Sequence, residues 1–432
     1  MKFCFVHAAD LHLDTPYEGV ATASPAVAEA LREASLDAFD ELVRLTLERG
    51  AAFLVLAGDI YDGAERGIRA QLRFLSGLRR LSAAGIPVFV AHGNHDPVGG
   101  WPGVREWPPG VRIFGAQEVE TFEIERDGEV LAAVSGISYG RRDVVENLTS
   151  RFPAAEGGRF QVAVLHCNVG GDPSHASYSP CTLDDLARSG HDYWALGHIH
   201  KQVVLHEGRP WVVYSGGTQG RSLKPSERGA KGVCVVHVDG GAVQAVESVA
   251  VDRVRFALLE VDVAGIADVG HLRVKLQEGA EALRASAGGR SLVVRALLRG
   301  RGPVHADLSC AGGAEGILQD LRDEYDAERP FLWWESLRDA TRPALDLDGI
   351  RGRSDFSAAL VERVDALLGA ADADAGASAD PVAHLAGRVI SMAPRKAAAH
   401  IPSPEAEETR ALLEEAQALA LDLLEEETDS CE

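Results

Sequence analysis

The chain has 432 residues, a formal net charge of −22 at pH 7, 46% hydrophobic residues and 25% charged residues. This length exceeds one typical core and predicts two domains with an appendage, while the acidic excess excludes a broadly basic protein that coats nucleic acid, although not a local binding site. No stretch is long and apolar enough to span a bilayer, and the six cysteines are scattered without a CxxC pair, so we expect a cytoplasmic protein with reduced thiols.

Up to about residue 250 the sequence alternates short apolar runs, which predict strands, with amphipathic stretches, which predict helices. Strands are expected at 3–8, 51–58 and 86–91, with helices across 26–49 and 67–83 between them. Further apolar runs follow, and few helices separate them. This pattern favours an α/β fold in which two sheets form the core and helices cover them, rather than a single doubly wound sheet.

The rest of the chain has a different texture. We expect a catalytic domain at 1–252, a smaller α+β domain at 253–369, a low-complexity connecting segment at 370–402 and a helical tail at 403–432. The tail holds eleven acidic residues against one arginine, and it therefore supplies −10 of the net charge. An apolar seam runs along it, at Leu412, Ala416, Leu419 and Leu423. Because like charges so dense are unfavourable on an isolated helix, the tail needs a surface with basic character, either on this chain or on a partner.

Five of the predicted strands end in side chains that bind transition metals. In chain order these are Asp10 and His12, Asp59, Asn94, His166, and His198 with His200. Open α/β folds place their ligands at the carboxyl ends of strands, and extended residues two apart point the same way. Imidazole combined with carboxylate favours Mn, Fe or Zn. Seven donors are too many for one ion, so they predict two ions that share a carboxylate, for which Asp59 has the central place.

The motifs DxH, GDxxD, GNHD, a lone His and GHxH, in this order, resemble the calcineurin-like metallophosphoesterase superfamily. The fuller stretches HAADLHLDTPYEG and LAGDIYD are similar to its DNA-repair exonuclease branch, the SbcD-like nucleases. The likeness covers roughly residues 1–250, including GGTQGRSLKPSERGAKG at 216–232, and it is loose from about 253 onward. It implies a four-layer αββα sandwich with a smaller capping domain, a site for two divalent ions, for which Mn²⁺ is the expected metal, and phosphodiester cleavage.

The resemblance also implies a role for each residue of the site. One ion would bind Asp10, His12, Asp59 and His200, and the other would bind Asp59, Asn94, His166 and His198. His95 would contact the scissile phosphate and help the leaving oxygen depart, while Asp62 would orient and charge that imidazole. Some similar repair nucleases carry a histidine at the Asp62 position and phosphatase relatives carry Asp, so Asp62 does not settle the substrate.

Basic side chains are candidates for DNA contacts. They are Arg66, Arg69 and Arg73 along the second helix, and Arg141, Arg142, Arg221 and Lys224 in later loops. A few phosphate contacts suffice for salt-dependent binding, although a basic helix face is more often simply solvated. Trp333 and Trp334 either stack on a base or, as we expect, pack in a core.

Together these observations predict an exonuclease-like DNA-repair enzyme, a metallophosphoesterase that acts on DNA. The resemblance to the SbcD-like nucleases further implies a coiled-coil, SMC-like ATPase as a partner, docked through the C-terminal helices. A homodimer is also considered, and no membrane is expected as a partner. Two alternatives stay open: an enzyme for a small phosphodiester such as a cyclic nucleotide, and a regulatory or scaffolding component of an ATPase complex. The complete ligand set argues against the scaffold, and the arginines argue mildly against the small substrate.

Overall fold

The computed structural model describes residues 2–15, 17, 25–63, 67–98, 106–126, 128–155, 158–171, 176–325, 329–373, 389 and 406–429. The chain divides into two compact units, which comprise Met1–Gly300 with Ala306–Thr341, and Arg301–His305 with Arg342–Glu432. The predicted connecting segment at 370–402 lies mostly outside the described residues, as does Arg66. The predicted domain boundaries stay predictions.

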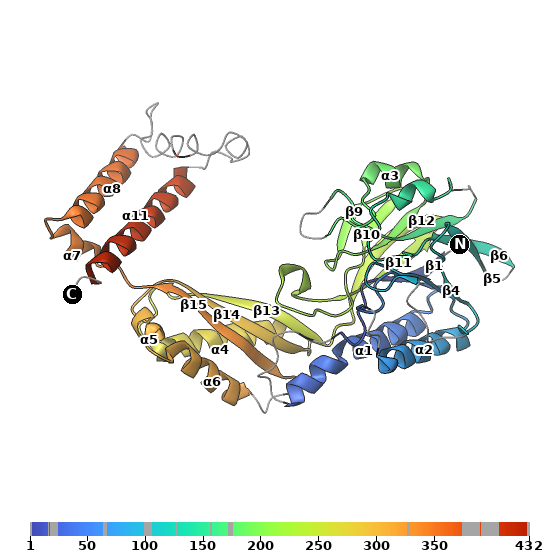
Figure 1. The fold of residues 1–432 in the computed structure, drawn as a ribbon, viewed down its shortest axis with the longest axis horizontal. Coiled ribbons are helices and arrows are strands. Elements are labelled where there is room, and N and C mark those ends of the chain that lie inside the picture. Colours follow the sequence, from blue (N-terminus) through green and yellow to red (C-terminus); the bar gives the residue numbers. More distant parts are fainter. Residues whose placement is uncertain are drawn as a thin grey trace. The chain divides into compact units, whose positions relative to one another are not determined.

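Two six-stranded sheets dominate the first unit (Figure 1). The first has the order β12-β11-β1-β2-β3-β4, with β1 (Lys2–Ala8), β2 (Leu54–Ala57), β3 (Val88–Ala91), β4 (Val111–Ile113), β11 (Gly232–Asp239) and β12 (Ala242–Ala250). The second has the order β5-β6-β7-β8-β10-β9, with β5 (Glu120–Arg126), β6 (Glu129–Gly136), β7 (Phe160–His166), β8 (Tyr193–Gly197), β9 (Val203–His206) and β10 (Trp211–Tyr214). Strands β1 to β4 run parallel, as do β6, β7, β8 and β10. Each sheet therefore collects the carboxyl ends of its parallel strands at one edge.

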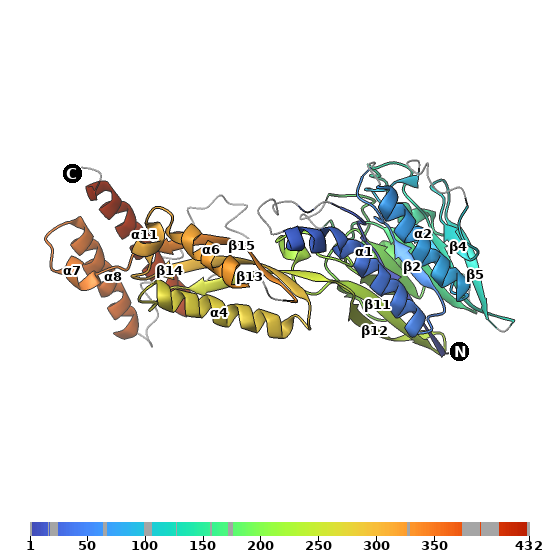
Figure 2. The same ribbon diagram turned by 90° about the horizontal axis from the view of Figure 1, so that it is seen from below.

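The two sheets face each other across an apolar core, because alternate side chains of a strand point to opposite faces. In β1, Phe5 points to the second sheet and meets the ring of Tyr193 edge-on, with 5.2 Å between centroids. Its neighbour Val6 packs instead among the apolar residues of helices α1 (Pro25–Glu48) and α2 (Ile68–Ala83), which lie side by side (Figure 2). Helix α3 (Leu183–Arg188) and the 3-10 helix η2 (Leu148–Arg151) cover the outer face of the second sheet. These four layers confirm the predicted fold class.

A three-stranded sheet follows, with the order β13-β14-β15 and the strands β13 (Val254–Asp262), β14 (Ser291–Arg301) and β15 (Leu332–Arg342). Helices α4 (Val269–Ser286) and α6 (Gly313–Tyr325) lie over one of its faces, and α5 (His305–Ser309) lies between β14 and α6 in the chain (Figure 1). Trp334 meets Tyr325 of α6 edge-on at 6.1 Å between centroids, and Trp333 packs against Leu31 of α1. Both tryptophans are buried. The expectation that they belong to a core is confirmed.

The second unit contains helices α7 (Leu347–Arg351), α8 (Phe356–Ala373) and α11 (Ala406–Asp429). Leu421 of α11 is fully buried against Ile350 and Val361. The neighbouring Asp422 is also buried, and it accepts two hydrogen bonds from the guanidinium group of Arg301, at 2.8 Å and 2.6 Å. The basic character that the acidic helix was expected to need is thus present within this unit.

The predicted apolar seam of the tail does not make this contact. Leu412, Leu419 and Leu423 are 55%, 50% and 59% exposed. Leu421 lies inward because it is on roughly the opposite side of the helix from those three leucines. The chain therefore packs α11 through a different face and leaves the leucine stripe in solvent.

Among the described residues, no helix has the length and apolarity that crossing a membrane requires.

Candidate metal centre

The strand ends that carry the predicted metal ligands meet between the two large sheets. The first sheet brings Asp10, His12, Asp59 and Asn94 to this place, and the second brings His166, His198 and His200. The backbone N–H of His198 donates to both carboxylate oxygens of Asp10, at 3.1 Å each, and so joins the end of β8 to the end of β1. Among the described residues, three groups of side chains have ligand atoms within 4.8 Å of one another: Asp10, His12 and His200; Asp10, Asp59 and His166; and His12, Asp62 and His95.

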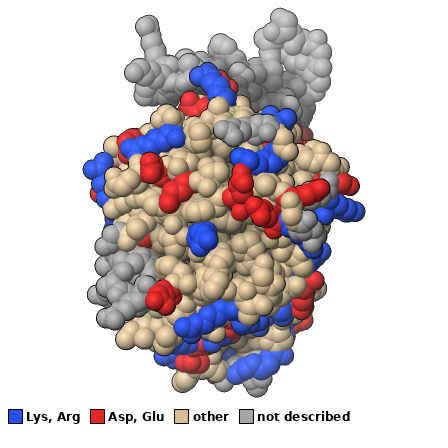
Figure 3. Space-filling view, turned by 90° about the vertical axis from the view of Figure 1, so that its right-hand side faces the viewer, with Lys and Arg blue, Asp and Glu red and all other residues tan. Residues whose placement is uncertain are grey.

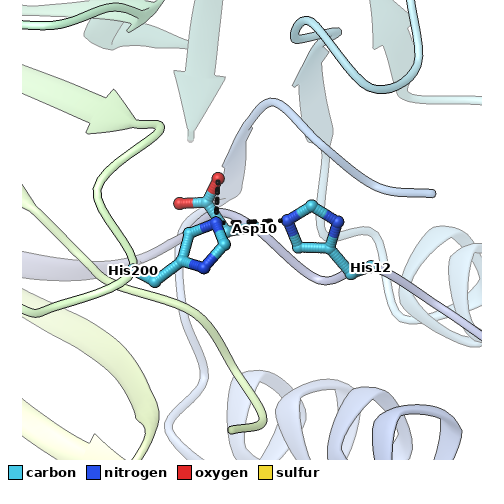
Figure 4. Close-up of side chains that lie close together, drawn as sticks. All are labelled: Asp10, His12 and His200. Carbon is cyan, nitrogen blue, oxygen red and sulfur yellow. Dashed lines mark hydrogen bonds and ion pairs between the residues drawn. The ribbon is translucent and has the colours of Figure 1, made fainter. Parts of the chain in front are cut away.

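The first group, Asp10, His12 and His200, converges on one point (Figure 4). The Nε2 atoms of His12 and His200 face each other at 3.3 Å, and Nε2 of His200 lies 4.0 Å from Oδ1 of Asp10. Two facing imidazole nitrogens form a hydrogen bond only when one of them presents a lone pair. Imidazole lone pairs beside a carboxylate are the donors that a divalent transition metal takes.

A second cluster of donors lies beside the first. Nε2 of His166 is 3.0 Å from Oδ1 of Asn94 and 3.4 Å from Oδ2 of Asp59. The same Oδ2 atom lies 3.9 Å from Nε2 of His12 in the first group. The ring of His198 stands 5.2 Å from that of His166, between centroids. Asp59 therefore contacts both clusters, which is the geometry that a shared ligand needs.

Four of the seven candidate ligands have backbone conformations that are rare for residues other than glycine. The φ angles of Asp10, His12, Asp59 and His198 are 51°, 44°, 52° and 101°. Each such conformation costs about 1–3 kcal/mol and persists only where its surroundings hold it. The N–H groups of Asp10 and His12 donate to the carbonyl oxygens of Gly58 and Asp59, at 3.0 Å and 3.1 Å. These bonds hold the end of β1 against the end of β2.

Two glycines are required because the donors pack directly against the backbone. A Cβ atom at Gly58 would overlap the ring of His166, and Gly58 also has a φ of 101°. A Cβ atom at Gly93 would overlap Oδ1 of Asp59. The glycines of the GDxxD and GNHD motifs thus leave room for the shared carboxylate and for the imidazole beside it.

The buried carboxylates of the site need positive charge to compensate them. Asp10 and Asp59 are each 1% exposed, and among the described residues neither has a lysine or arginine within ion-pair distance. Burial raises the pKa of Asp59 to about 7, and the nearby charge of Asp96 acts in the same direction. Burial also raises the pKa of Asp10 well above its ordinary value, while it lowers the pKa of His166 to about 4 and that of His12 well below its usual range. Buried carboxylates beside neutral imidazoles fit divalent cations.

Hydrogen bonds orient the rings. His166 contacts the carbonyl oxygen of Ala57 through Nδ1 at 3.0 Å, and His198 contacts that of Ala176 through Nε2 at 2.9 Å. A ring that donates one N–H to a carbonyl presents the lone pair of its other nitrogen, as metal-binding histidines do. Nδ1 of the buried His12 has no hydrogen-bond partner among the described residues. The residues present therefore fit a pair of divalent ions.

His95 and Asp62 lie at the more open side of the site. Nδ1 of His95 is 2.5 Å from Oδ1 of Asp62, and the two side chains are 30% and 27% exposed. Burial lowers the pKa of His95, but the hydrogen bond to Asp62 and the charges of Asp59 and Asp62 outweigh it, so the net direction is upward. The hydrogen bond to His95 in turn lowers the pKa of Asp62. The contact with Asp62 thus favours the protonated form of His95 beside the two donor clusters.

The candidate DNA-contact residues have different surroundings. Arg69 pairs with Glu33, and Arg73 pairs with Asp37 at 3.0 Å and with Asp40 at 2.5 Å, so the carboxylates of α1 neutralise this part of α2. In contrast, Arg141, Arg142 and Lys224 are exposed and have no ion pair among the described residues. Arg221 lies in the site itself, where its Nη1 donates to Oδ2 of Asp62 at 3.0 Å.

Sequence reasoning missed two acids that support the site. Glu227, in the 3-10 helix η3 (Pro225–Glu227), accepts a hydrogen bond from Nδ1 of His200 at 2.6 Å. Asp96 accepts from the N–H groups of Gly93 and Ile60, each at 2.8 Å, and so joins two loops of the site. Asp96 directly follows the predicted residues in GNHDP. The tendency of Asp to accept hydrogen bonds from nearby backbone N–H groups in turns is the signal that could have identified it. Glu227 stands alone in a glycine-rich stretch, and no spacing rule identifies it.

Comparison with known proteins identifies the family. The sequence pattern of the calcineurin-like phosphoesterases matches residues 4–202, and that of the middle domain of metallophosphoesterase YhaO matches residues 256–342. The uncharacterized metallophosphoesterase YhaO of Bacillus subtilis (strain 168) is 34% identical over 365 residues, which cover 84% of this chain and 86% of that protein. The chain belongs to the calcineurin-like metallophosphoesterases.

More distant relatives of this metallophosphoesterase have names from DNA repair. The DNA double-strand break repair protein Mre11 of Thermoplasma acidophilum is 26% identical over 297 residues, which cover 66% of this chain and 73% of that protein. The SbcD component of the nuclease SbcCD of Bacillus subtilis is 26% identical over 276 residues, which cover 55% of this chain and 66% of that protein. The predicted membership of the SbcD-like branch is confirmed, and with it the class of phosphoesterase hydrolase.

We predict that Gly93→Ala weakens the binding of Mn²⁺ to the metallophosphoesterase by about 10–100-fold, the range found when groups supporting a metal site are disturbed. The added methyl group would displace the Asp59 carboxylate, which contacts both donor clusters. Calorimetric titration with Mn²⁺ measures the effect. Gly316→Ala is the control, because a Cβ atom there meets nothing within 4 Å. Wild-type affinity in Gly93→Ala would show that Asp59 is not a ligand.

Proposed function

We propose that the protein is a metal-dependent phosphodiesterase that hydrolyses DNA, an exonuclease-like repair nuclease with two Mn²⁺ ions. The observation that carries this proposal is the position of Asp59, whose carboxylate contacts His12 on one side and His166 on the other. Two clusters joined by a carboxylate suit two ions about 3.5–4 Å apart, an arrangement used for in-line displacement at phosphorus. Asp10, His12, Asp59 and His200 would hold one ion, and Asp59, Asn94, His166 and His198 the other.

The bound ions would offset phosphate charge and lower the pKa of a bound water toward ~7. The chain's own residues supply the rest. The side chain of His95 is 30% exposed and pairs with Asp62, so it would contact the scissile phosphate and protonate the leaving oxygen. Asp62 fixes the His95 ring through Nδ1 and leaves Nε2 free to face the substrate. The substrate's leaving group departs with the proton that His95 provides.

Support for a DNA substrate comes from the loop that follows β6. Tyr139 anchors this loop beside the site, because its N–H donates to the carbonyl oxygen of His92 at 3.0 Å and its hydroxyl to that of His166 at 2.6 Å. Arg141 and Arg142 follow directly and are exposed. Figure 3 shows one face of the molecule, on which basic and acidic side chains are interspersed without a continuous basic field. Local phosphate contacts therefore fit this protein better than a broad basic surface.

His95→Ala should leave two Mn²⁺ ions per chain but lower turnover by about 10²–10⁴-fold, the usual contribution of a general acid. His166→Ala should lose one ion together with activity, since Nε2 of His166 lies between Asn94 and Asp59. Metal content and the hydrolysis rate of a chromogenic phosphodiester are measured on the same samples. An equal loss of metal in both variants would contradict the assigned roles.

The substrate is tested with charge reversal on the loop after β6. Arg141→Glu with Arg142→Glu should weaken cleavage of labelled DNA while sparing a small chromogenic phosphodiester, and should flatten the salt dependence of DNA binding by about two units of slope. Arg69→Gln with Arg73→Gln is the matched comparison, because those arginines already pair with α1 and Gln adds no negative charge beside the carboxylates there. Equal damage to both substrates by the loop variant would favour a small phosphodiester, such as a cyclic nucleotide, as the natural substrate.

We further propose that an SMC-like coiled-coil ATPase docks on the leucine stripe of α11, defined by Leu412, Leu419 and Leu423. The relative from the nuclease SbcCD is by its name one component of a complex. The stripe is exposed at the same time as Leu421 holds the helix in its own unit. Apolar residues in this helical spacing suit a partner helix or coiled coil.

Leu412→Glu with Leu419→Glu should abolish association with an SMC-like ATPase from the same organism, measured by co-purification, and leave Mn²⁺ binding unchanged. Both side chains are half exposed or more, so the fold tolerates the change. Phe356→Glu on α8 is the control, because Phe356 is 71% exposed in the same unit. An association that survives the double substitution, or that Phe356→Glu removes equally, would contradict docking on the stripe.

A further inference from the structure

Glu227 is a buried acid that contacts the metal centre from outside the ligand set. It is 5% exposed, and its Oε1 atom lies 2.6 Å from Nδ1 of His200. The other nitrogen of that ring, Nε2, points to His12 and to Asp10. The Nδ1–H bond to a carboxylate fixes which nitrogen of the imidazole carries the proton, and it directs the lone pair of Nε2 into the site.

The segment around Glu227 is built to hold this carboxylate in place. The N–H of Glu227 donates to the carbonyl oxygen of Lys224 at 2.9 Å, and the N–H of Arg221 donates to Oε2 of Glu227 at 3.2 Å. A Cβ atom at Gly220 would overlap the carbonyl oxygen of Glu227. The ammonium group of Lys231 donates to the carbonyl oxygen of His200 at 2.8 Å. The segment thus grips both the backbone and the ring of His200.

Arg221 continues the contact toward the other functional histidine. Its Nη2 lies 3.6 Å from Oε1 of Glu227, and its Nη1 donates to Oδ2 of Asp62 at 3.0 Å. Asp62 in turn holds His95 at 2.5 Å. A continuous series of charged contacts therefore runs from His200 through Glu227, Arg221 and Asp62 to His95. Because Arg221 is placed between two carboxylates, it compensates the charge of both.

We propose that Glu227 is a positioning residue of the metal centre. It orients His200 through the Nδ1–H hydrogen bond and, through Arg221 and Asp62, keeps the position of that ring fixed relative to His95. The assignment rests on the proposed function, since it takes His200 as a metal ligand and His95 as the group that meets the phosphate. Glu227 does not belong to the groups of candidate metal ligands. Its loss acts through the ring that it holds.

The test compares three substitutions of Glu227 in the full-length protein, with Mn²⁺ alone as the probe. Glu227→Gln keeps an acceptor oxygen within reach of Nδ1 but loses the charge, whereas Glu227→Asp keeps the charge but falls short by one methylene group. Calorimetry and the electron paramagnetic resonance signal of free Mn²⁺ give the two dissociation constants. We expect the affinity for Mn²⁺ to fall in the order wild type, Glu227→Gln, and then Glu227→Asp together with Glu227→Ala. For Glu227→Ala the affinity for one of the two ions should fall by about 10–100-fold.

Glu247→Ala is the matched control. Glu247 also contacts a histidine and an arginine, His237 at 3.2 Å and Arg49 at 2.7 Å, but these lie on β11 and at the end of α1. Wild-type affinity in a folded Glu227→Ala variant, or an equal loss in Glu247→Ala, would overturn the proposal. If Glu227→Ala does not fold, the other two variants test the proposal. Tighter Mn²⁺ binding by Glu227→Asp than by Glu227→Gln would overturn it, because the charge of Glu227 and not its orientation of His200 would then matter. None of these readouts uses DNA, so a protein that binds Mn²⁺ as expected but cleaves no DNA would refute the proposed function alone.

Discussion

Two buried carboxylates, surrounded by histidines and not paired with lysine or arginine among the described residues, govern this structure. Asp10 and Asp59 lie at the meeting point of the two sheets, and among the described residues no lysine or arginine is within ion-pair distance of either. The same burial drives His12 and His166 toward the neutral form. A protein interior tolerates such charge only when something else compensates it. Divalent cations supply that compensation, and the arrangement of the donors follows from this need.

The fold accepts local strain to keep the donors together. Positive φ angles at Asp10, His12, Asp59 and His198 oppose the ordinary preferences of these residues, and hydrogen bonds between the strand ends hold them. The sandwich core allows this, because its central strands β2, β3, β7 and β8 are buried on both faces and fix where each loop begins. Strain of this kind is typical of functional sites. His95 stands on the more open side of the centre, where its side chain is 30% exposed.

Sequence reasoning located the donors because parallel strands place their carboxyl ends at one edge, so five short motifs had to converge. It failed where position depends on packing between distant segments. Glu227 reaches His200 only through the fold of a glycine-rich loop. The pairing of Arg69 with Glu33 of another helix was likewise not foreseen, and the role of Arg69 in DNA contact stays a prediction. The inward face of α11 was not predicted from the sequence, because it is set by the packing of Leu421 and by the buried pair of Asp422 and Arg301.

The most direct test of the two-ion centre is X-ray diffraction from crystals grown with Mn²⁺, recorded at the manganese absorption edge. We expect two anomalous peaks about 3.5–4 Å apart, both within bonding distance of the Asp59 carboxylate. One peak should lie toward His12 and His200, and the other toward His166 and His198. A single peak, or two peaks that do not share Asp59, would contradict the arrangement on which the proposed chemistry depends.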